Sequence, residues 1–253
     1  MEKEYYSRET FRNTFANWNH MDSRTSDIFL NSEYVYKILN SRIPLYKRKE
    51  NRIDEIALLN DELITVPDRK VYINNQYFGF RMKNGGIPLL EYIFNNNIDF
   101  TGKLEILHKI KNIIEYLDKL GIIHGDVRLS NFLFKDGIIR LTDVNNMIFS
   151  DDQEDHANLL YKDWYKATGT FKFLDEYACN LICFLLLNYP TEFLINIFSR
   201  DFYFDNNFLK DLLNIKCDKF DQEVLQGVKA SILGDRDAIK QLKPNTFLID
   251  YLR

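Results

Sequence analysis

Three polar residues between positions 123 and 145 have the types and spacing that phosphate chemistry requires. Asp126 and Asn131 share one short stretch, and Asp143 follows after a second apolar run. Phosphoryl transfer needs a carboxylate to orient the attacking hydroxyl group, two carboxyl or amide groups to hold magnesium ions, and a lysine to steady the phosphates that stay behind. The stretch supplies all of these groups except the lysine, which must come from elsewhere in the chain.

The elements around this stretch predict how its polar residues are positioned. Apolar residues recur at helical spacing from Leu104 to Leu120, and Gly121 is a typical stop signal just before the stretch. Residues 132–134 and 138–141 read as two strands joined by a turn at Gly137. If these strands pair antiparallel, the hairpin brings Asp143 back beside Asn131.

The N-terminal part of the chain reads as two hairpins with a helix between them. Residues 27–30 and 34–39 predict the first hairpin, residues 47–60 the helix, and residues 70–73 and 77–82 the second hairpin with an Asn-rich turn. Residues 2–20 favour a helix or an irregular lead-in. The second strand of the first hairpin carries Lys37, the candidate for the missing lysine.

The pattern changes from strands to helices after Lys83, where the first Gly-Gly pair of the sequence follows. Residues 174–187 are apolar nearly all round, as in a buried helix, and helical patterns recur at 193–198, 208–215, 223–233 and 238–242. We therefore expect an α+β protein with two lobes. Residues 1–83 would form a small antiparallel β lobe with one helix, and residues 84–253 a mainly helical lobe.

Composition narrows the classes of function. The net charge of −4 and the pI of about 5.7 argue against a nucleic-acid-binding protein. The three cysteines, Cys179, Cys183 and Cys217, have no metal-ligand spacing and favour reduced core residues. The N-terminus lacks a secretory pattern, and the longest apolar run is shorter than the roughly 20 residues that span a bilayer. These features favour a cytoplasmic protein with no membrane partner, and leave its oligomeric state open.

The polar stretch resembles the protein-kinase family. That family has a catalytic loop of the form His-Arg-Asp-x-x-x-x-Asn and a metal-binding turn Asp-Phe-Gly. The corresponding strings here are His124-Gly125-Asp126-x-x-x-x-Asn131 and Asp143-Val144-Asn145. The resemblance implies a bilobal kinase-like fold with ATP and Mg²⁺ as cofactors. It further implies that Asp126 orients or deprotonates the substrate hydroxyl group, while Asn131 and Asp143 bind magnesium.

The same resemblance covers about residues 25–190 and implies roles for further positions. Lys37 matches the family lysine that touches the α- and β-phosphates, with Glu55 as its helix partner and Glu50 as the alternative. Asp175 matches the aspartate that opens the central buried helix and anchors the catalytic loop. The adenine base would lie between the apolar side chains of Val35 and Leu133. It would also contact the hinge backbone at residues 80–83, which include Phe80, Arg81 and Met82.

The sequence also departs from the family pattern. No glycine precedes Gly79, so the glycine-rich loop over the phosphates is absent, and Ser23-Arg24-Thr25-Ser26 would have to take its place. Gly125 replaces the family arginine, which implies that switching by phosphorylation of the activation segment is missing. Val144-Asn145 replaces Phe-Gly. These departures predict an atypical kinase.

Together these features predict an enzyme that transfers the γ-phosphate of Mg-ATP to a hydroxyl group, as an atypical Ser/Thr protein kinase does. Arg128, two positions after Asp126, resembles the catalytic-loop cation of Ser/Thr kinases and favours a protein acceptor. A kinase for a sugar, choline or an antibiotic is one alternative, and a pseudokinase that serves as a binding module is another. Taken singly, Asp126 and Asn131 are consistent with turn-forming residues, Asp143 with a strand-end cap, and Lys37 with a surface lysine. The order and spacing of all four residues together favour a kinase-like active site.

Overall fold

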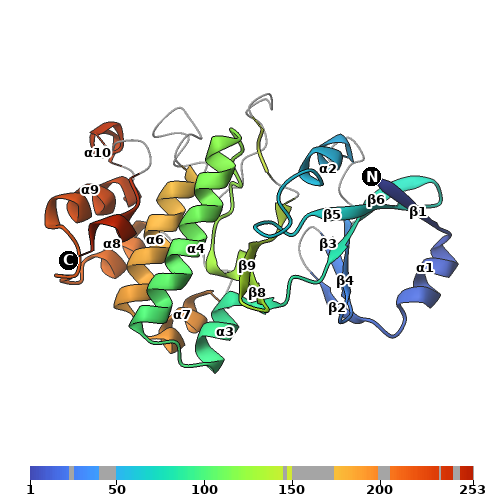
Figure 1. Cartoon of the computed structure of the whole chain (residues 1–253), viewed down its shortest axis with the longest axis horizontal. Coiled ribbons are helices and arrows are strands. Elements are labelled where there is room, and N and C mark those ends of the chain that lie inside the picture. Colours follow the sequence, from blue (N-terminus) through green and yellow to red (C-terminus); the bar gives the residue numbers. More distant parts are fainter. Residues whose placement is uncertain are drawn as a thin grey trace. The chain divides into compact units, whose positions relative to one another are not determined.

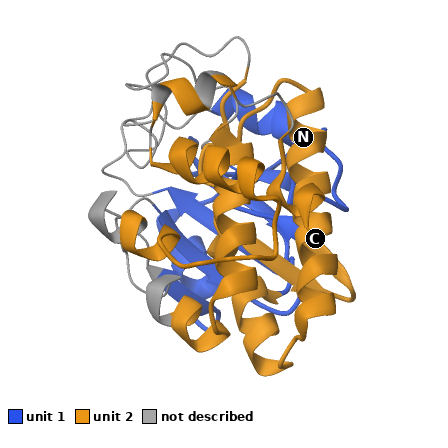
Figure 2. Ribbon diagram, turned by 90° about the vertical axis from the view of Figure 1, so that its left-hand side faces the viewer, with its two compact units in different colours: residues 1–86, 140–145 blue, residues 87–139, 146–253 orange. Residues whose placement is uncertain are grey.

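A computed structural model of the chain describes residues 1–22, 26–39, 50–144, 147–149, 174–198, 206–233, 235–241 and 246–252. The protein is a mixed α+β structure that divides into two compact units, which Figure 2 colours separately. Unit 1 contains residues 1–86 and 140–145, and unit 2 contains residues 87–139 and 146–253. Unit 1 therefore takes the end of the polar stretch with Asp143, whereas Asp126 and Asn131 belong to unit 2.

A six-stranded sheet forms the centre of unit 1 (Figure 1). Its strands follow the spatial order β1-β5-β6-β4-β3-β2. Their bounds are β1 Glu2–Tyr6, β2 Asn19–Asp22, β3 Ser26–Leu30, β4 Tyr34–Leu39, β5 Pro67–Ile73 and β6 Gln76–Lys83. All neighbouring strands pair antiparallel except β1 and β5, which are parallel. The expectation of a purely antiparallel lobe therefore fails at this one pair.

Both predicted hairpins of unit 1 are present. The first consists of β3 and β4, and the second consists of β5 and β6. Asn74 and Asn75 turn the second hairpin with φ angles of 51° and 62°, a left-handed conformation that asparagine tolerates better than most residues. The predicted helix is shorter than expected within the described residues, since α2 covers Glu50–Ile56; residues 47–49 lie outside them.

Residues 2–20 form more structure than the sequence predicted. Helix α1 (Arg8–Phe15) starts at a capping box of Ser7 and Thr10, and strands β1 and β2 flank it. Phe11 and Phe15 of α1 are buried against one face of the sheet, in a cluster with Tyr36, Ile38, Val71 and Ile73. The prediction of a helix or an irregular lead-in missed both strands. Strand β1 pairs with the distant β5, whereas β2 pairs with β3, which follows it closely in the sequence.

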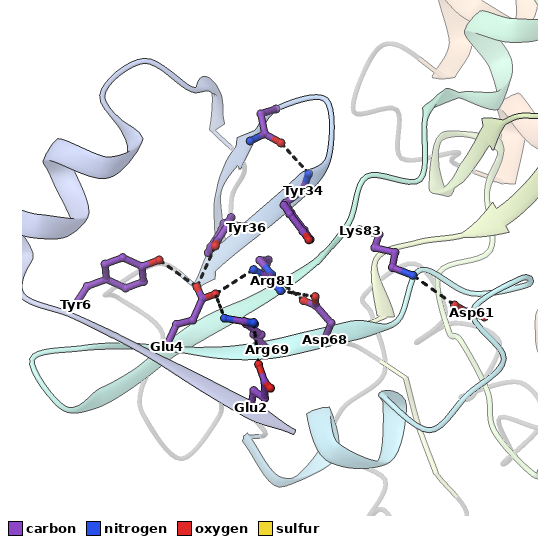
Figure 3. A network of polar contacts seen from close by, with 11 residues as sticks. Glu2, Glu4, Tyr6, Tyr34, Tyr36, Asp61, Asp68, Arg69, Arg81 and Lys83 are labelled. Carbon is purple, nitrogen blue, oxygen red and sulfur yellow. Dashed lines mark hydrogen bonds and ion pairs between the residues drawn. The ribbon is translucent and has the colours of Figure 1, made fainter.

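A polar network on the same face fastens β1 to the sheet, as Figure 3 shows. The carboxylate of Glu4 accepts hydrogen bonds from the hydroxyl groups of Tyr6 at 3.0 Å and Tyr36 at 2.9 Å. It also pairs with the guanidinium groups of Arg69 at 3.0 Å and Arg81 at 3.1 Å. One acid on β1 thus bonds to side chains of β4, β5 and β6.

Unit 2 is mainly helical in its described part. A small sheet contains β7 (Ile87–Pro88), β8 (Phe132–Lys135) and the start of β9 (Ile138–Leu141), and the boundary between the units falls within β9. The other elements are α3 Leu89–Asn95, α4 Phe100–Lys119, η2 Leu129–Asn131, α6 Leu174–Asn188, α7 Thr191–Phe198, α8 Asn206–Leu213, α9 Gln222–Ile232, α10 Arg236–Gln241 and η6 Leu248–Tyr251.

Local signals explain the two long helices of unit 2. Helix α4 begins earlier than predicted because Asp99 caps it by accepting a hydrogen bond from the Gly102 amide, and it ends before Gly121 as expected. Helix α6 is buried along most of its length, as its apolar sequence predicted. Within the described ranges, no helix is long and apolar enough to cross a membrane.

Gly79 of β6 gives a test of the sheet. A Cβ atom at this position would lie 2.0 Å from the carbonyl oxygen of Lys37, which belongs to the backbone of β4 and cannot rotate away. We expect Gly79→Ala to lower the free energy of unfolding by about 2 kcal/mol or more, as overpacking does. Urea denaturation would measure the loss.

Gln76→Ala is the matched control, because Gln76 is an exposed residue of the same strand. Its effect should stay within about 0.5 kcal/mol. Equal effects of the two substitutions would contradict the close approach of β6 to β4.

Candidate active site

Two of the loop residues predicted from the sequence, Asn131 and Arg128, bond to the carboxylate of the third, Asp126, in unit 2. Asp126 is buried, with 2% of its surface exposed, and Asn131 is buried at the end of η2. The side-chain nitrogen of Asn131 donates to the backbone oxygen of Asp126 at 2.8 Å and to its Oδ2 at 3.0 Å. Arg128 Nη2 forms an ion pair with the same Oδ2 at 3.0 Å. The carboxylate of Asp126 is therefore held in one orientation.

Asp175, at the start of α6, holds the backbone of the loop just before Asp126. Its carboxylate accepts hydrogen bonds from the backbone amides of His124 at 2.6 Å and Gly125 at 3.0 Å. These contacts confirm the anchoring predicted for Asp175. Burial raises the pKa of the Asp175 carboxyl group, while the nearby His124 and the two amide hydrogen bonds oppose this shift.

His124 supports the loop by packing and by one hydrogen bond. Its side chain is fully buried, and its Nδ1 accepts from the backbone amide of Asp126 at 3.3 Å. Gly125 has a φ angle of +74°, in the left-handed region that glycine adopts at little cost. The conformation of the backbone thus contributes to the choice of glycine at this position.

Asp143 lies in unit 1, where main-chain hydrogen bonds hold the segment before it. The amide of Leu141 donates to the oxygen of Leu63 at 2.9 Å, and the amide of Thr65 donates to the oxygen of Leu141 at 2.9 Å. Two residues later Asp143 has a φ angle of +62°. Non-glycine residues with this conformation are uncommon and concentrate at functional sites.

The carboxylate of Asp143 forms an ion pair with Lys37, which is 106 residues away in sequence. Lys37 is 6% exposed, so this lysine is buried inside unit 1 and is not a surface residue. Burial strengthens an interaction between opposite charges, because little water screens it. The pair joins two residues that the sequence assigned to phosphates and to magnesium.

Four of the predicted nucleotide-binding residues share one face of the sheet. Val35 pairs in register with Met82, and Lys37 pairs with Phe80, so these four side chains point to the same side. The side chain of Arg81 points to the opposite face, where it pairs with Asp68 at 2.6 Å. Only the backbone of Arg81 is thus available for the predicted hinge contact.

The acids of α2 do not bind Lys37. Glu55 pairs with Arg52 at 2.5 Å on the same helix, and about half of its side chain is exposed. Glu50 accepts a hydrogen bond from the hydroxyl group of Tyr72 and lies 3.7 Å from Lys70. Both candidates for the partner of Lys37 therefore have other partners in this structure.

Leu133 lies in β8 of unit 2, in register with Pro88 of β7. The adjacent Phe134 stacks on Tyr92, with ring centroids 3.6 Å apart. Two predicted features, Asn145 and the segment Ser23-Arg24-Thr25, lie outside the described residues.

Asn131 and Asp143 each carry an oxygen atom of a type that binds the magnesium implied by the kinase resemblance. Both side-chain hydrogen bonds described for Asn131 use its nitrogen, so its carbonyl oxygen stays available to a cation. Asp143 contributes a carboxylate whose side chain is one quarter exposed. Oxygen ligands of these two types are those that Mg²⁺ prefers.

Comparison with known proteins gave no family for this chain. No protein-family model matches the sequence, and no curated protein matches it significantly.

Sequence reasoning missed Lys70 of β5. It is 5% exposed and its ammonium group lies 2.7 Å from Asp54 of α2. The alternation of β5 carried a signal, because Val71 and Ile73 occupy one face while Lys70 and Tyr72 occupy the other. The second signal was the spacing of Glu50 and Asp54, which lie on one side of a helix.

The hydrogen bonds of Asp175 to the loop before Asp126 give a prediction about stability. In Asp175→Asn the side-chain NH2 group would face one of the two backbone N–H groups that now donate to the Asp175 carboxylate. That buried N–H group would then lose its acceptor. We expect the free energy of unfolding to fall by about 1 to 3 kcal/mol. Urea denaturation at neutral pH would measure the change.

Asp221→Asn serves as the control, since Asp221 also accepts from two backbone amides but caps α9 at a more exposed position. Asparagine and aspartate are nearly equal as helix caps, so this change should cost less than about 0.5 kcal/mol. A loss of the same small size in Asp175→Asn would refute the anchoring.

Proposed function

We propose that the protein is an ATP-dependent phosphotransferase of an atypical protein-kinase-like type. It transfers the γ-phosphate of Mg-ATP to a hydroxyl group, and the acceptor is a serine or threonine of a protein. The proposal includes the bilobal kinase-like fold, with residues 1–83 as the nucleotide-binding lobe and residues 84–253 as the catalytic lobe.

The observation that carries the proposal is the buried ion pair of Lys37 with Asp143. Burying an ammonium group is costly unless it is paired, and a pair between distant parts of the chain must hold both segments in place. The left-handed backbone of Asp143 adds a strained conformation at the same point. A lysine steadying phosphates beside a magnesium-binding aspartate explains both features.

The loop of unit 2 supplies the groups that act on the acceptor. In the proposed reaction the bond between the γ-phosphorus and the β,γ-bridging oxygen breaks, and a bond to the hydroxyl oxygen forms. The hydroxyl proton passes to the carboxylate of Asp126 and then to solvent, while ADP leaves. Arg128 and Asn131 hold that carboxylate in position before the acceptor binds.

Magnesium, when bound to Asn131 and Asp143, would neutralise charge on the phosphates. Lys37 would add its positive charge to the α- and β-phosphates. The apolar face formed by Val35 and Met82 would pack against the adenine base, and both residues are buried.

The cation of Arg128 supports a protein acceptor. Ser/Thr kinases carry a cation two residues after the catalytic aspartate, and the guanidinium group of Arg128 pairs with the carboxylate of Asp126. The next experiments distinguish this proposal from two alternatives: phosphate transfer to a small molecule, and a binding module that transfers no phosphate.

Asp126→Asn tests the catalytic carboxylate. The amide keeps the size of the side chain but cannot take the hydroxyl proton, so kcat should fall by about 10²- to 10⁴-fold. Transfer from radiolabelled ATP to a mixture of protein acceptors, to the chain itself and to sugar and choline acceptors would measure it. Asp118→Asn is the control, because Asp118 is exposed near the end of α4; it should keep wild-type activity.

Label transferred only to small molecules would contradict the protein acceptor. Absence of transfer to every acceptor, or equal transfer by wild type and Asp126→Asn, would refute the proposed reaction.

Asp143→Asn tests nucleotide binding without relying on transfer. A ligand that binds only the folded protein stabilises it, by about 2.7 kcal/mol at a concentration one hundred times Kd. We expect Mg-ATP to raise the Tm of the wild type more than ATP with a chelator does. The variant should lose the magnesium-dependent part, because it loses a charged ligand.

The control is Asp61→Asn, an exposed aspartate of unit 1 whose loss should leave the shift unchanged. A magnesium-dependent shift of equal size in Asp143→Asn would exclude this residue as a ligand. A nucleotide-dependent shift in a wild-type protein that transfers no phosphate would favour the pseudokinase alternative.

A further inference from the structure

Two buried lysines share one face of the sheet in unit 1. Lys37 of β4 and Lys70 of β5 both pair in register with Phe80 of β6, so the three side chains point to the same side. The lysines are 6% and 5% exposed, and Phe80 is 1% exposed. Two strand spacings separate their backbones by roughly 10 Å. The face thus holds two positive charges with a phenylalanine between them.

Each lysine has its own acidic partner. Lys37 pairs with Asp143, whereas Lys70 lies 2.7 Å from Asp54 and 3.7 Å from Glu50 of α2. The hydrogen bond from Lys70 is the main reason why the pKa of the Asp54 carboxyl group is lowered. The hydroxyl group of Tyr72, also on β5, donates to Glu50. Asp54 and Glu50 of α2 are therefore directed to β5 and not to β4, while Glu55 pairs with Arg52 of the same helix.

The apolar side of α2 covers the same region. Ile53 and Ile56 are each 1% exposed, and α2 packs against β5 and β6. Phe80, which separates the two lysines, belongs to β6. A displacement of α2 would admit water to this face and screen the charge of Lys37.

We propose that Lys70 is a positioning residue for the phosphoryl transfer: its ion pairs with Asp54 and Glu50 fix α2 over β5 and β6, which keeps Lys37 for Asp143 and the nucleotide phosphates. This inference rests on the proposed function. It divides between two lysines the tasks of holding the helix and binding phosphate, which the sequence had assigned to Lys37 alone.

A purely structural role for Lys70 makes a different prediction. The side chains of Asp54 and Glu50 are 49% and 39% exposed, and ion pairs with such exposed acids contribute little to stability. Removal of one partner of an ion pair is costly when the charge left behind is buried, but the two acids that Lys70→Met leaves behind are partly exposed to water. Lys70→Met should therefore stay folded. Because the expected change in Tm is small for either role, a measurement of Tm alone does not distinguish a structural role from a positioning role.

The experiment compares Lys70→Met with Lys3→Met in the full chain. Lys3 of β1 is the register neighbour of Lys70 but is exposed, so it receives the same substitution without a buried ion pair. We expect the KM for Mg-ATP to rise about tenfold or more in Lys70→Met, because small displacements of positioning groups are costly. Lys3→Met should keep the wild-type KM. Lys70→Arg, which keeps the positive charge, should have a KM close to that of the wild type.

Hydrogen exchange gives a readout that does not depend on activity. The amides of residues 50–56 should exchange faster in Lys70→Met, by about tenfold, while those of α4 in unit 2 keep their wild-type protection. Asp54→Asn should show the same pattern, and its combination with Lys70→Met should be less than additive, as expected for partners in one interaction.

Unchanged exchange in α2 would overturn the anchoring by Lys70. Faster exchange in α2 with an unchanged KM in an active enzyme would overturn the positioning role and leave only a structural pair. A wild type that neither binds nor turns over ATP would refute the proposed function and with it the positioning role, while the exchange experiment would still decide whether Lys70 anchors α2.

Discussion

The burial of the Lys37 ammonium group is the constraint on which unit 1 depends. An unpaired ammonium group in a sheet would be too costly, so a carboxylate must reach it, and Asp143 does so from 106 residues away. Residues 140–145 therefore belong to unit 1 although the sequence on both sides belongs to unit 2. The main-chain bonds of Leu141 to Leu63 and Thr65 hold that segment in register.

Strand β4 is covered on both faces of the sheet. Helix α1 packs on the face of Tyr36 and Ile38, opposite to Lys37, and α2 packs against β5 and β6. Strand β4 is buried from Val35 to Leu39, including the lysine between them. Glu4 connects β1 to three strands through Tyr36, Arg69 and Arg81. The packing of β4 thus relies in part on residues at the beginning of the chain.

Local patterns predicted the hairpins and the long helices, because turn residues and apolar periodicity are encoded within a few neighbouring positions. The order of Lys37, Asp126, Asn131 and Asp143 in the sequence also predicted the candidate site. The position of Asp175 predicted its anchoring of the loop. It could not predict the parallel pairing of β1 with β5, which joins strands far apart in the chain. The partners of the α2 acids were missed for a related reason: a helix shows from sequence which acids share a side, but not which strand that side contacts.

Gly125 illustrates how a backbone requirement can account for a departure from a family pattern. From the sequence, glycine in place of the family arginine implied a missing regulatory contact and an atypical kinase. In the structure the φ angle of +74° favours glycine, while its amide donates to Asp175. A side chain at this position would strain the turn that presents Asp126, whatever its charge. Glycine therefore relieves a conformational cost in the loop, and the backbone conformation is by itself a sufficient reason for its presence.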